Sequence, residues 1–342
     1  MYKNNERMLA WITKIDKIEK HPNADSLDIC TIGGWKCITK LGEFNLGEMV
    51  VYISIDSFIP NTVAPFLSKD KEPKEYNGIK GERLRTIKLR GTISQGLLLP
   101  IDILNGHMDY EDYIHLNVGD DVTENLGIQK YEPPIPACLS GVAKGVFPSF
   151  IPKTDAERIQ NIDLNEYVNH HYEVSEKIDG SSGTFYVNDG EFNVCSRNLN
   201  LAYSKSNTFW KVAIKNNLEE KLKKLGLNIA IQGEVVGPGI QKNKYNLKDH
   251  ELYVFNIYDI NKGEYFSVEE RQTFCEELGL NHVPVIDEVY LVDVSIDNWL
   301  KFAEGKSALN NQTEREGLVF KRVDDCYVNF KCISNKFLLK SE

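Results

Sequence analysis

The chain has 342 residues, 42% hydrophobic and 26% charged, which is ordinary for a globular protein and leaves room for two domains. No apolar run approaches the ~18 residues of a membrane span, and the N-terminal MYKNNERM lacks the apolar core of a signal peptide, so we expect a cytoplasmic protein. The net charge of -10 argues against a protein that coats nucleic acid non-specifically, although a local basic stripe is enough for an enzyme that acts on nucleic acid.

The cysteine and histidine patterns indicate how a metal would be bound. Seven cysteines are scattered without a C-x-x-C pair, and seven histidines show no H-x-x-x-H spacing. These patterns indicate neither a zinc site nor a disulfide framework, and buried reduced thiols are the expected state. Any metal is therefore expected to be held by carboxylates and phosphates.

Short strand patterns fill the first part of the chain. LAWITKIDKI, LDICTIG, WKCITK and EMVVYISIDSFIP lie between residues 8 and 60 and are separated by Gly and Asn/Asp turns. Their close spacing predicts a small antiparallel barrel. The string HPNAD at residues 21–25 fits the turn of the first hairpin, because Pro and Asn/Asp set turn dihedrals. It also resembles the first hairpin of OB-fold domains that bind tRNA, but we favour the plain turn.

A basic stretch follows a polar segment at residues 64–80, which has helix or loop character. RLRTIKLRGTISQGLLLP predicts two strands around Gly91. Its alternation places four basic residues at a strand edge, namely Arg83, Arg85, Lys88 and Arg90. Two interpretations stay open: a surface that faces phosphates, or a solvated face.

Prolines interrupt the pattern between residues 118 and 151 and indicate a linker. We predict one domain over residues 1–130, a linker over 131–152 and a second domain over 153–342. The string PKTDAERIQNI predicts a helix start capped by Thr154, with Glu157 three residues on. Strands then alternate with helices predicted at 207–225, in VEERQTFCEELG and in NWLKFAEGKS, which indicates an α+β domain with mainly antiparallel strands.

A run of short charged motifs begins at residues 175–184, SEKIDGSSGT. Lys177, followed by Asp179 and Gly180, suits a lysine that attacks a phosphate, since glycines let a phosphate approach the backbone. One such string alone is more often a turn. Five further strings follow at strand ends, namely SRN at 196–198, QGEVVGPG at 232–239, VFNIYDI at 254–260, EGLVFK at 316–321 and FKCISNK at 330–336.

The order of these strings resembles motifs I, Ia, III, IIIa, IV and V of ATP-dependent polynucleotide ligases and mRNA capping enzymes. Together with the OB-like first domain, the lead-in TDAERIQNI and the ending ISNKFLLK, the chain resembles the Deinococcus-type and Naegleria-type RNA ligase family over nearly its whole length. Only six residues follow Lys336, so no second OB domain with a sixth motif is expected. The resemblance implies an α+β protein in which an N-terminal OB-fold β-barrel precedes an antiparallel-sheet nucleotidyltransferase domain of the ATP-grasp-like ligase type.

The resemblance also implies a reaction in three nucleotidyl transfers. A lysine attacks ATP and forms lysyl-AMP, AMP passes to a 5′-phosphate, and a 3′-OH attacks this end and releases AMP. The expected cofactors are ATP and Mg²⁺ or Mn²⁺, and the expected partner is nicked or broken RNA, with no protein partner and a monomeric state. A lysine amine with a pKa near ~10.4 is a poor nucleophile at neutral pH, so a nearby cation must favour its neutral form.

The resemblance assigns roles to individual residues. Five positions form the expected catalytic set: Lys177, Asp179, Arg197, Lys331 and Lys336. Six are expected to bind the cofactor: Gln160, Glu176, Gly180, Glu234, Phe255 and Lys331. Lys177 is the nucleophile, Arg197 contacts the AMP phosphate or the incoming 5′-phosphate, and Lys331 contacts the α-phosphate. Lys336 departs from the K-x-K spacing of many ligases. Glu234 binds the ribose hydroxyls and Phe255 stacks on adenine.

Asp179 and Glu316 are expected to hold the metal through water molecules, because Mg²⁺ keeps several waters when proteins bind it. Plain structural interpretations remain for each side chain: strand-end carboxylates for Glu234 and Glu316, a surface cation for Arg197 and a core aromatic for Phe255. Two other functions stay open, a DNA ligase of the same superfamily and a non-catalytic OB-fold protein that binds RNA or tRNA. RNA is favoured by analogy with the domain order.

Overall fold

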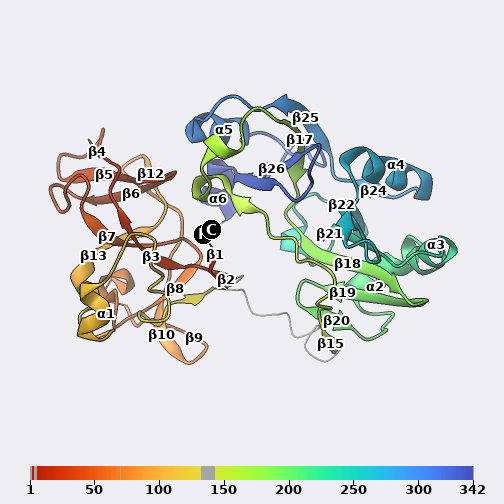
Figure 1. Cartoon of the computed structure of the whole chain (residues 1–342), viewed down its shortest axis with the longest axis horizontal. Helices are drawn as coiled ribbons and strands as arrows, with labels where there is room; N and C mark the ends of the chain where they lie inside the picture. The colour runs from red at the N-terminus through yellow and green to blue at the C-terminus, as the bar shows by residue number, and fades with distance from the viewer. Residues whose placement is uncertain (1, 4–5, 70, 132–142, 342) are drawn as a thin grey trace. The chain divides into compact units, whose positions relative to one another are not determined.

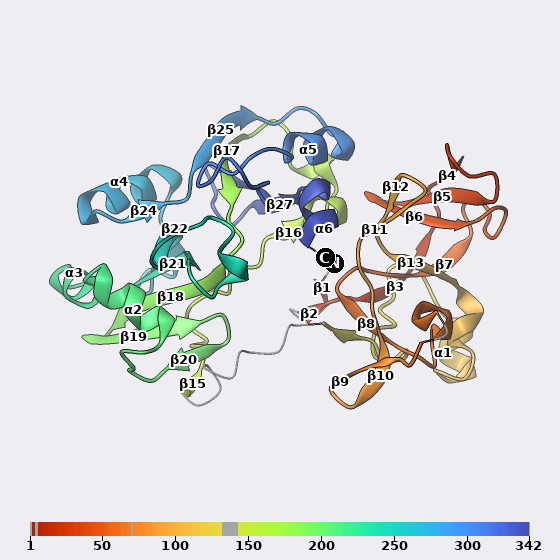
Figure 2. The same cartoon turned by 180° about the vertical axis from the view of Figure 1, so that it is seen from behind.

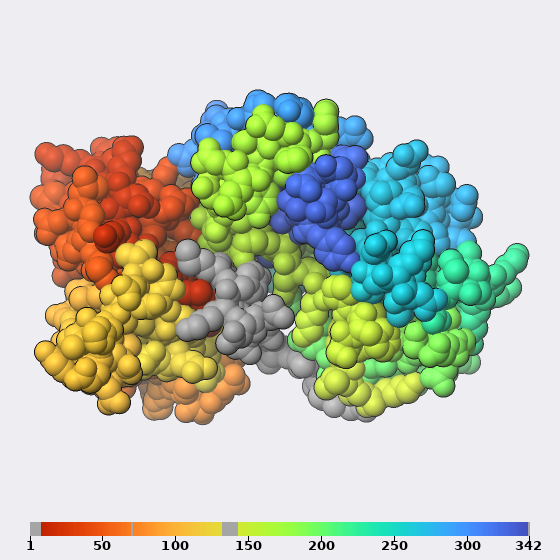
Figure 3. All heavy atoms as spheres, in the orientation of Figure 1, coloured from red at the N-terminus to blue at the C-terminus, as the bar shows by residue number. Residues whose placement is uncertain are grey.

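The computed structural model describes residues 2–3, 6–69, 71–131 and 143–341, which form two compact units. The first unit contains residues 1–134, 160–162 and 339–342, and the second contains 135–159 and 163–338. Figures 1 and 2 show both units from two sides, and Figure 3 shows all their heavy atoms. Each unit is described by itself. Much of the predicted linker, residues 132–142, lies outside the described residues, and the predicted domain boundaries stay predictions.

Short antiparallel strands build the first unit. They are β1 (Tyr2–Lys3), β2 (Glu6–Arg7), β3 (Ala10–Lys14), β4 (Lys17–Lys20), β5 (Leu27–Ile32), β6 (Trp35–Lys40), β7 (Met49–Ile53), β8 (Ser57–Pro60), β9 (Lys74–Tyr76), β10 (Ile79–Arg83), β11 (Ile87–Leu89), β12 (Thr92–Ser94), β13 (Leu97–Pro100) and β14 (Gln129–Lys130). The larger sheets have the orders β13-β7-β3, β4-β5-β6 and β14-β8-β10-β9. The helical elements are 3-10 turns at Pro65–Ser68 and Ile101–Leu104 and helix α1 (Tyr110–Ile114).

Strand β7 is buried on both faces and therefore divides the core of the first unit. Val51 and Ile53 belong to one hydrophobic cluster, whereas Val50 and Tyr52 belong to another. This division follows from the strand geometry, because successive side chains point to opposite faces. The polar segment 64–80, predicted as helix or loop, contains the first 3-10 turn and strand β9.

The HPNAD string forms a turn, as predicted, and this turn holds the tip of a neighbouring hairpin. His21 Nδ1 accepts from the backbone N–H of Asn23 at 3.1 Å, so Nε2 donates to the carbonyl of Leu89 at 3.1 Å. Asn23 Nδ2 donates to the carbonyl of Arg90 at 3.0 Å. Strands β11 and β12 form the predicted pair around Gly91.

The four basic residues of the predicted strand edge do not share one sheet. Arg83 ends β10, pairs with Asp56 at 2.7 Å and lies 4.8 Å over the ring of Tyr131, whereas Lys88 lies exposed on β11. The prediction of a single edge is therefore wrong. The local alternation could not reveal the break, since β10 pairs with β8 and β9 instead of β11.

In its described residues, the second unit combines two sheets with five α-helices. The strands are β15 (Ala143–Val146), β16 (Glu157–Arg158), β17 (His171–Lys177), β18 (Ser181–Asn188), β19 (Glu191–Ser196), β20 (Leu199–Leu201), β21 (Ile229–Val236), β22 (Glu251–Asp259), β23 (Glu264–Tyr265), β24 (Asn281–His282), β25 (Val285–Tyr290), β26 (Gly317–Arg322) and β27 (Asn329–Ile333). The helices are α2 (Thr208–Lys215), α3 (Leu218–Lys224), α4 (Val268–Leu278), α5 (Ile296–Phe302) and α6 (Asn335–Ser341). In the described residues, no helix is long and apolar enough to cross a membrane.

The KIDG string connects the two sheets of this unit (Figure 1). The eight-stranded sheet has the order β15-β20-β19-β18-β21-β22-β23 with β24 beside β22, and the five-stranded sheet has the order β16-β27-β26-β17-β25. Side chains of α2, α3 and α4 pack against the larger sheet in one hydrophobic cluster. Since Lys177 ends β17 and Ser181 begins β18, the chain passes from the smaller to the larger sheet at residues 177–181.

Two predicted helices differ in the structure. The helix expected to start at Thr154 is absent, because Glu157 and Arg158 form β16 beside β27 before a 3-10 turn at Ile159–Asn161. Pairing with a distant strand overrides the local capping pattern. The helix predicted over 207–225 is divided into α2 and α3, because Asn217 takes a left-handed conformation with φ of 51°, which Asn tolerates better than most residues. The helix predicted in VEERQTFCEELG forms as α4, with a capping box at Ser267.

A buried polar network joins the two sheets. Arg271 of α4 pairs with Glu173 of β17 at 2.5 Å, and both side chains are only 1% exposed. Arg271 Nε also donates to Nε2 of His282 at 2.9 Å. Burial lowers the pKa of His282 to about 4, so this ring is neutral and accepts the bond. Lys321 of β26 donates to the carbonyl of Phe255 on β22 at 2.7 Å.

Candidate active site

The predicted nucleophile lies beside a carboxylate at the end of its strand. Strand β17 pairs with β26 so that Lys177 is opposite Gly317, and this register brings Glu316 next to it. Lys177 Nζ donates to Glu316 Oε2 at 2.8 Å. The side chains are 27% and 15% exposed, so the pair is sheltered but still open to a ligand.

The residues after Lys177 are held by a second strand and a loop. The backbone N–H of Gly180 donates to Glu234 Oε1 at 3.1 Å, and β18 pairs with β21 so that Glu234 is opposite Ser182. The backbone N–H of Asp179 donates to the hydroxyl of Tyr245 at 2.7 Å. The carboxylate of Asp179 forms an ion pair with Lys244. The turn at 178–180 is therefore fixed from both sides.

The electrostatics of the site favour a protonated lysine. Burial alone lowers the pKa of Lys177, but the carboxylates of Glu316 and Glu234 outweigh burial and raise it above its ordinary value. Burial raises the pKa of Glu234 to about 8, although the Lys177 ammonium opposes this shift. Burial also raises the pKa of Glu316 against the same ammonium. The crowded carboxylates thus create a site that attracts further cations.

Phe255 is presented by a β-bulge. Between β21 and β22 the register changes from Gln232 opposite Asn256 to Gly233 opposite Val254, which leaves Phe255 as the extra residue. Bulges redirect side chains and are common beside active sites. Phe255 packs with Ile178, Val236 and Tyr245, next to the KIDG turn. Lys321 holds this bulge through the Phe255 carbonyl and the Asn256 side chain.

The other predicted residues have different surroundings. Glu176 is buried and accepts from the backbone N–H of Ala308 at 2.7 Å, and it faces the opposite side of β17 from Lys177 because strand side chains alternate. Arg197 lies exposed after β19 and pairs with Asp155 at 2.6 Å.

Three further predicted residues lie beyond this group. Lys331 lies on β27, two strands from Lys177 in the same sheet, and its charge acts on the Glu316 carboxylate. Lys336 is exposed at the start of α6 and pairs with Glu304 at 2.8 Å. Gln160 belongs to the first unit, whereas Lys177 belongs to the second. Packing within the second unit therefore does not place Gln160 beside Lys177.

The carboxylates fit a divalent cation held through water. Oxygen donors suit Mg²⁺ and Mn²⁺, and Asp179, Glu234 and Glu316 all act on the pKa of Lys177. In the part of the chain that the structure describes, no group of three His, Cys, Asp or Glu side chains is close enough to ligate a metal directly. The donor set therefore matches the predicted outer-shell roles of Asp179 and Glu316, which stay predictions.

Three site residues were missed by the sequence analysis. Lys244 and Tyr245 contact Asp179 from a loop that is 65 residues away in the chain. Lys244 Nζ also lies 4.1 Å over the ring of Phe337. Lys321 lies in the EGLVFK string but received no role. The available signal was the position of Lys321 in a run of buried strand residues, since a lysine is almost never buried without a partner.

Gly180→Ala is expected to lower adenylylation by about 100-fold, the cost typical of a ~1 Å misplacement of reacting groups. A Cβ at Gly180 would lie 2.5 Å from the carbonyl oxygen of Val235 and 2.9 Å from Glu234 Cγ, so the turn must shift. The measurement is the initial rate of covalent AMP transfer. Gly145→Ala is the matched control because nothing lies within 4 Å of its Cβ. Equal rates in both variants would show that the turn tolerates the shift.

Comparisons with known proteins agree with this fold. A family model described as RNA ligase matches residues 170–340, and a model described as an OB-fold domain matches residues 9–101. The structure of Naegleria gruberi RNA ligase with PPi is 43% identical, with a TM-score of 0.89, and the match covers 97% of this chain and 98% of that chain. A comparison with curated proteins gives no match.

Two further structures of the Naegleria gruberi enzyme are each 42% identical with a TM-score of 0.90, and each match covers 98% of this chain and 100% of that chain. One is a lysine-to-alanine mutant with ATP and Mn, and the other is a glutamate-to-alanine mutant with AMP and Mn. The chain belongs to the RNA ligase family. The predicted fold, an N-terminal OB-fold domain followed by a domain rich in antiparallel strands, is confirmed.

Proposed function

We propose that this RNA ligase joins 3′-OH and 5′-phosphate ends of RNA through lysyl-AMP and an adenylylated 5′-end. The observation that carries this proposal is Lys177, which lies 2.8 Å from Glu316 at the junction of the two sheets. The expectation of an ATP-dependent RNA ligase is confirmed by the family match and by the relatives solved with ATP and AMP. The DNA ligase and the non-catalytic alternatives are not favoured.

In the first step, the Lys177 amine attacks the α-phosphorus of ATP. An N–P bond forms, the P–O bond to pyrophosphate breaks, and the amine loses its proton. Glu316 Oε2, at 2.8 Å, is the acceptor within reach of that proton and holds the amine in place. A divalent cation, when bound, neutralises charge on the phosphoryl oxygens and favours the neutral amine. The Mn in the Naegleria structures supports Mn²⁺ or Mg²⁺ as this cofactor.

The surrounding residues orient the nucleotide. Phe255, on the bulge beside Ile178, stacks on adenine, and Glu234, fixed by the Gly180 N–H, binds the ribose hydroxyls. Lys331 contributes positive charge to the phosphates from β27. Arg197, exposed on the β19–β20 turn, exchanges Asp155 for a phosphate of AMP or of the incoming 5′-end.

The substrate is nicked or broken RNA, and the protein acts as a cytoplasmic monomer. The OB-fold domain either binds this RNA, as such barrels commonly do, or positions the β- and γ-phosphates of ATP. RNA and DNA are distinguished by sealing nicks that carry a ribonucleotide or a deoxynucleotide at the 3′-OH side. Equal sealing of both would contradict the choice of RNA.

The test is incubation of the wild-type protein with ATP labelled in the α-phosphate and with Mg²⁺ or Mn²⁺. The expected result is label bound covalently to the protein, which added pyrophosphate removes because the first step is reversible. Label that adheres without a covalent bond would survive neither denaturation nor gel separation. Absence of covalent label with both metals would contradict the proposal.

A further inference from the structure

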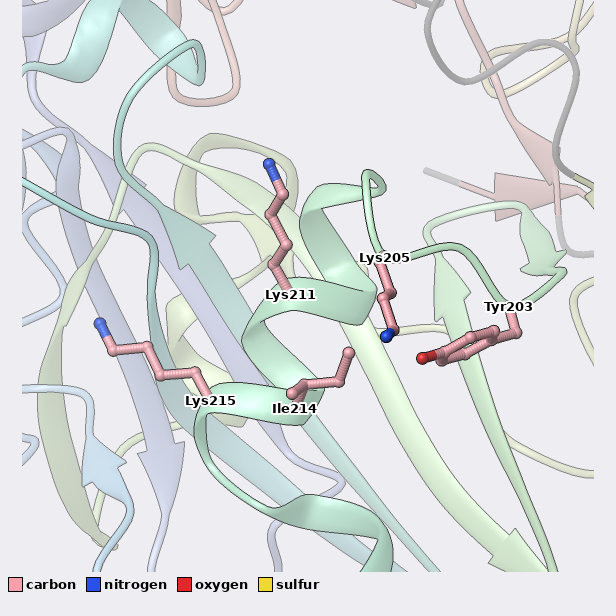
Figure 4. A pocket seen from close by; sticks show the side chains of 5 residues that line it. All are labelled: Tyr203, Lys205, Lys211, Ile214 and Lys215. Carbon is pink, nitrogen blue, oxygen red and sulfur yellow. The ribbon is translucent and has the colours of Figure 1, made fainter.

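A shallow hollow of about 490 Å³ lies on the second unit at the loop that precedes α2 (Figure 4). Five side chains line it and are named together the Tyr203 patch: Tyr203, Lys205, Lys211, Ile214 and Lys215. Tyr203 and Lys205 come from the loop and point toward each other, whereas the other three come from α2 (Figure 4). No predicted site residue belongs to this patch.

Tyr203 is an exposed aromatic ring with a fixed position. The residue is 60% exposed. Its ring contacts Trp210 edge to face, with 5.0 Å between centroids and an interplanar angle of 79°. Trp210 is buried, packs against Phe192 and donates from Nε1 to the carbonyl of Leu201 at 3.3 Å. The exposed ring is therefore held ready for another flat group to stack on it.

The charge of the patch is positive in a protein whose net charge is -10. Lys205 and Lys211 are exposed and form no ion pair within the described ranges, whereas Lys215 pairs with Asp249 at 3.0 Å. Among the described residues, none that lines the hollow is acidic. Lys205 points toward the Tyr203 ring and Lys211 borders the same hollow from α2 (Figure 4), so the patch combines positive charge with a fixed aromatic ring, which matches a ligand that carries both phosphates and planar bases.

The elements that carry the patch pack against the strand that follows the catalytic turn. Gly183, three residues after Gly180, packs under the first turn of α2, since a Cβ there would lie 3.1 Å from the ring of Phe209. Tyr203 follows β20, the second strand of the hairpin whose turn carries Arg197. Arg197 and Tyr203 are six residues apart in the chain, and six extended residues span at most ~20 Å. One nucleic-acid strand of a few nucleotides can therefore reach both Arg197 and Tyr203.

We propose that the Tyr203 patch binds a single-stranded segment of the RNA substrate next to the end to be joined. One unstacked base stacks on Tyr203, and neighbouring phosphates contact Lys205 and Lys211. Proteins read RNA largely through such unpaired, splayed bases, which stack on aromatic side chains. This inference rests on the proposed function, because it names where that substrate is held.

The test measures RNA binding and adenylylation separately in the full-length protein. The variants are Tyr203→Ala, Tyr203→Phe and the double variant Lys205→Glu/Lys211→Glu. The control, Lys224→Glu/Lys301→Glu, makes the same charge change at exposed lysines of α3 and α5. The probe is a 5′-phosphorylated, single-stranded RNA at several salt concentrations, and sealing is followed with pre-adenylylated RNA so that it does not depend on ATP.

We expect Tyr203→Ala to weaken RNA binding about tenfold, because a stacked base is lost, and Tyr203→Phe to bind as the wild type does. The double lysine variant should bind at least tenfold more weakly, and its salt slope should fall by about 1.4, or ~0.7 per lost phosphate contact. Adenylylation should stay unchanged in all variants.

Several outcomes would overturn the inference. One is wild-type binding by both Tyr203→Ala and the double lysine variant. A second is an equal loss of RNA binding in the control Lys224→Glu/Lys301→Glu, which would show that the loss comes from the changed net charge and not from the patch. A third is an unchanged salt slope in the double lysine variant. A wild-type protein that takes no label from ATP contradicts the proposed function instead, so the two failures are distinguishable.

Discussion

Lys177→Ala abolishes covalent transfer of AMP to the protein: this is the largest effect that we expect from a single substitution. In the proposed first step the amine at Lys177 forms the N–P bond, and alanine offers no group that replaces it. The measurement is protein-bound label after incubation with ATP labelled in the α-phosphate and Mg²⁺ or Mn²⁺. Lys177→Met serves as a second variant, because it fills the space of the side chain between Glu316 and Glu234.

The control for this prediction is Lys301→Ala, an exposed lysine on α5 that should keep the wild-type level of label. Pre-adenylylated RNA provides a second control, since sealing of this substrate skips the first two steps and should survive in Lys177→Met. Label on either Lys177 variant would mean that another residue is the nucleophile. A folded variant that neither takes label nor seals would place Lys177 in the last step as well.

The first step should also depend on pH. Because the carboxylates of Glu316 and Glu234 raise the pKa of Lys177 against the effect of burial, only a small fraction of the amine is neutral at pH 7. Below that pKa the neutral fraction grows about tenfold per pH unit. The single-turnover rate of adenylylation should therefore rise between pH 6 and 8. A flat profile would show that a step other than amine deprotonation limits the rate.

Arg271→Ala should destabilise the second unit by about 3–5 kcal/mol, the typical cost of removing one member of a buried ion pair. Glu173 would then remain buried with its charge uncompensated, since both side chains are 1% exposed. For a unit of this size the loss corresponds to roughly 10 °C in melting temperature. Thermal and urea unfolding monitored by circular dichroism measure the effect.

Two further variants show whether the cause is the buried charge. Glu173→Met/Arg271→Met removes both charges, so it should recover much of the stability lost in Arg271→Ala. Lys223→Ala breaks an exposed ion pair with Glu219 on α3 and should change stability by less than about 1 kcal/mol. A loss in Lys223→Ala as large as in Arg271→Ala would rule out burial as the reason.

The strands and the order of the motifs could be predicted from the sequence because each motif joins a hydrophobic strand to a charged residue at its end. Lys177 and Glu316 lie at or next to strand ends and Glu234 lies two residues before the end of β21, and strand pairing brings them together. The local pattern of segment 154–161 predicts a helix. Only the pairing of Glu157 and Arg158 with the distant strand β27 reveals that β16 forms instead.

The contacts of the loop at 241–246 could not be predicted. Its sequence QKNKYN has the composition of a solvated turn. Gln241, Lys242 and Asn243 take left-handed backbone conformations, which bend the chain so that Lys244 reaches Asp179. Asn243 is the only one of the three whose residue type favours this conformation, and Gln241 and Lys242 give no local signal for the bend. The partners of Lys321 were similarly hidden, because Phe255 and Asn256 come from another sheet.

Strand β17 carries both Glu173 and Lys177, four positions apart and on the same face, since strand side chains alternate. The ion pair that joins the two sheets and the proposed nucleophile therefore belong to the same strand. A shift of this strand along its neighbours by even part of a residue would move the amine away from Glu316. Heat inactivation and loss of the native sheet junction should consequently follow the same transition curve, so that activity reports directly on the integrity of the fold.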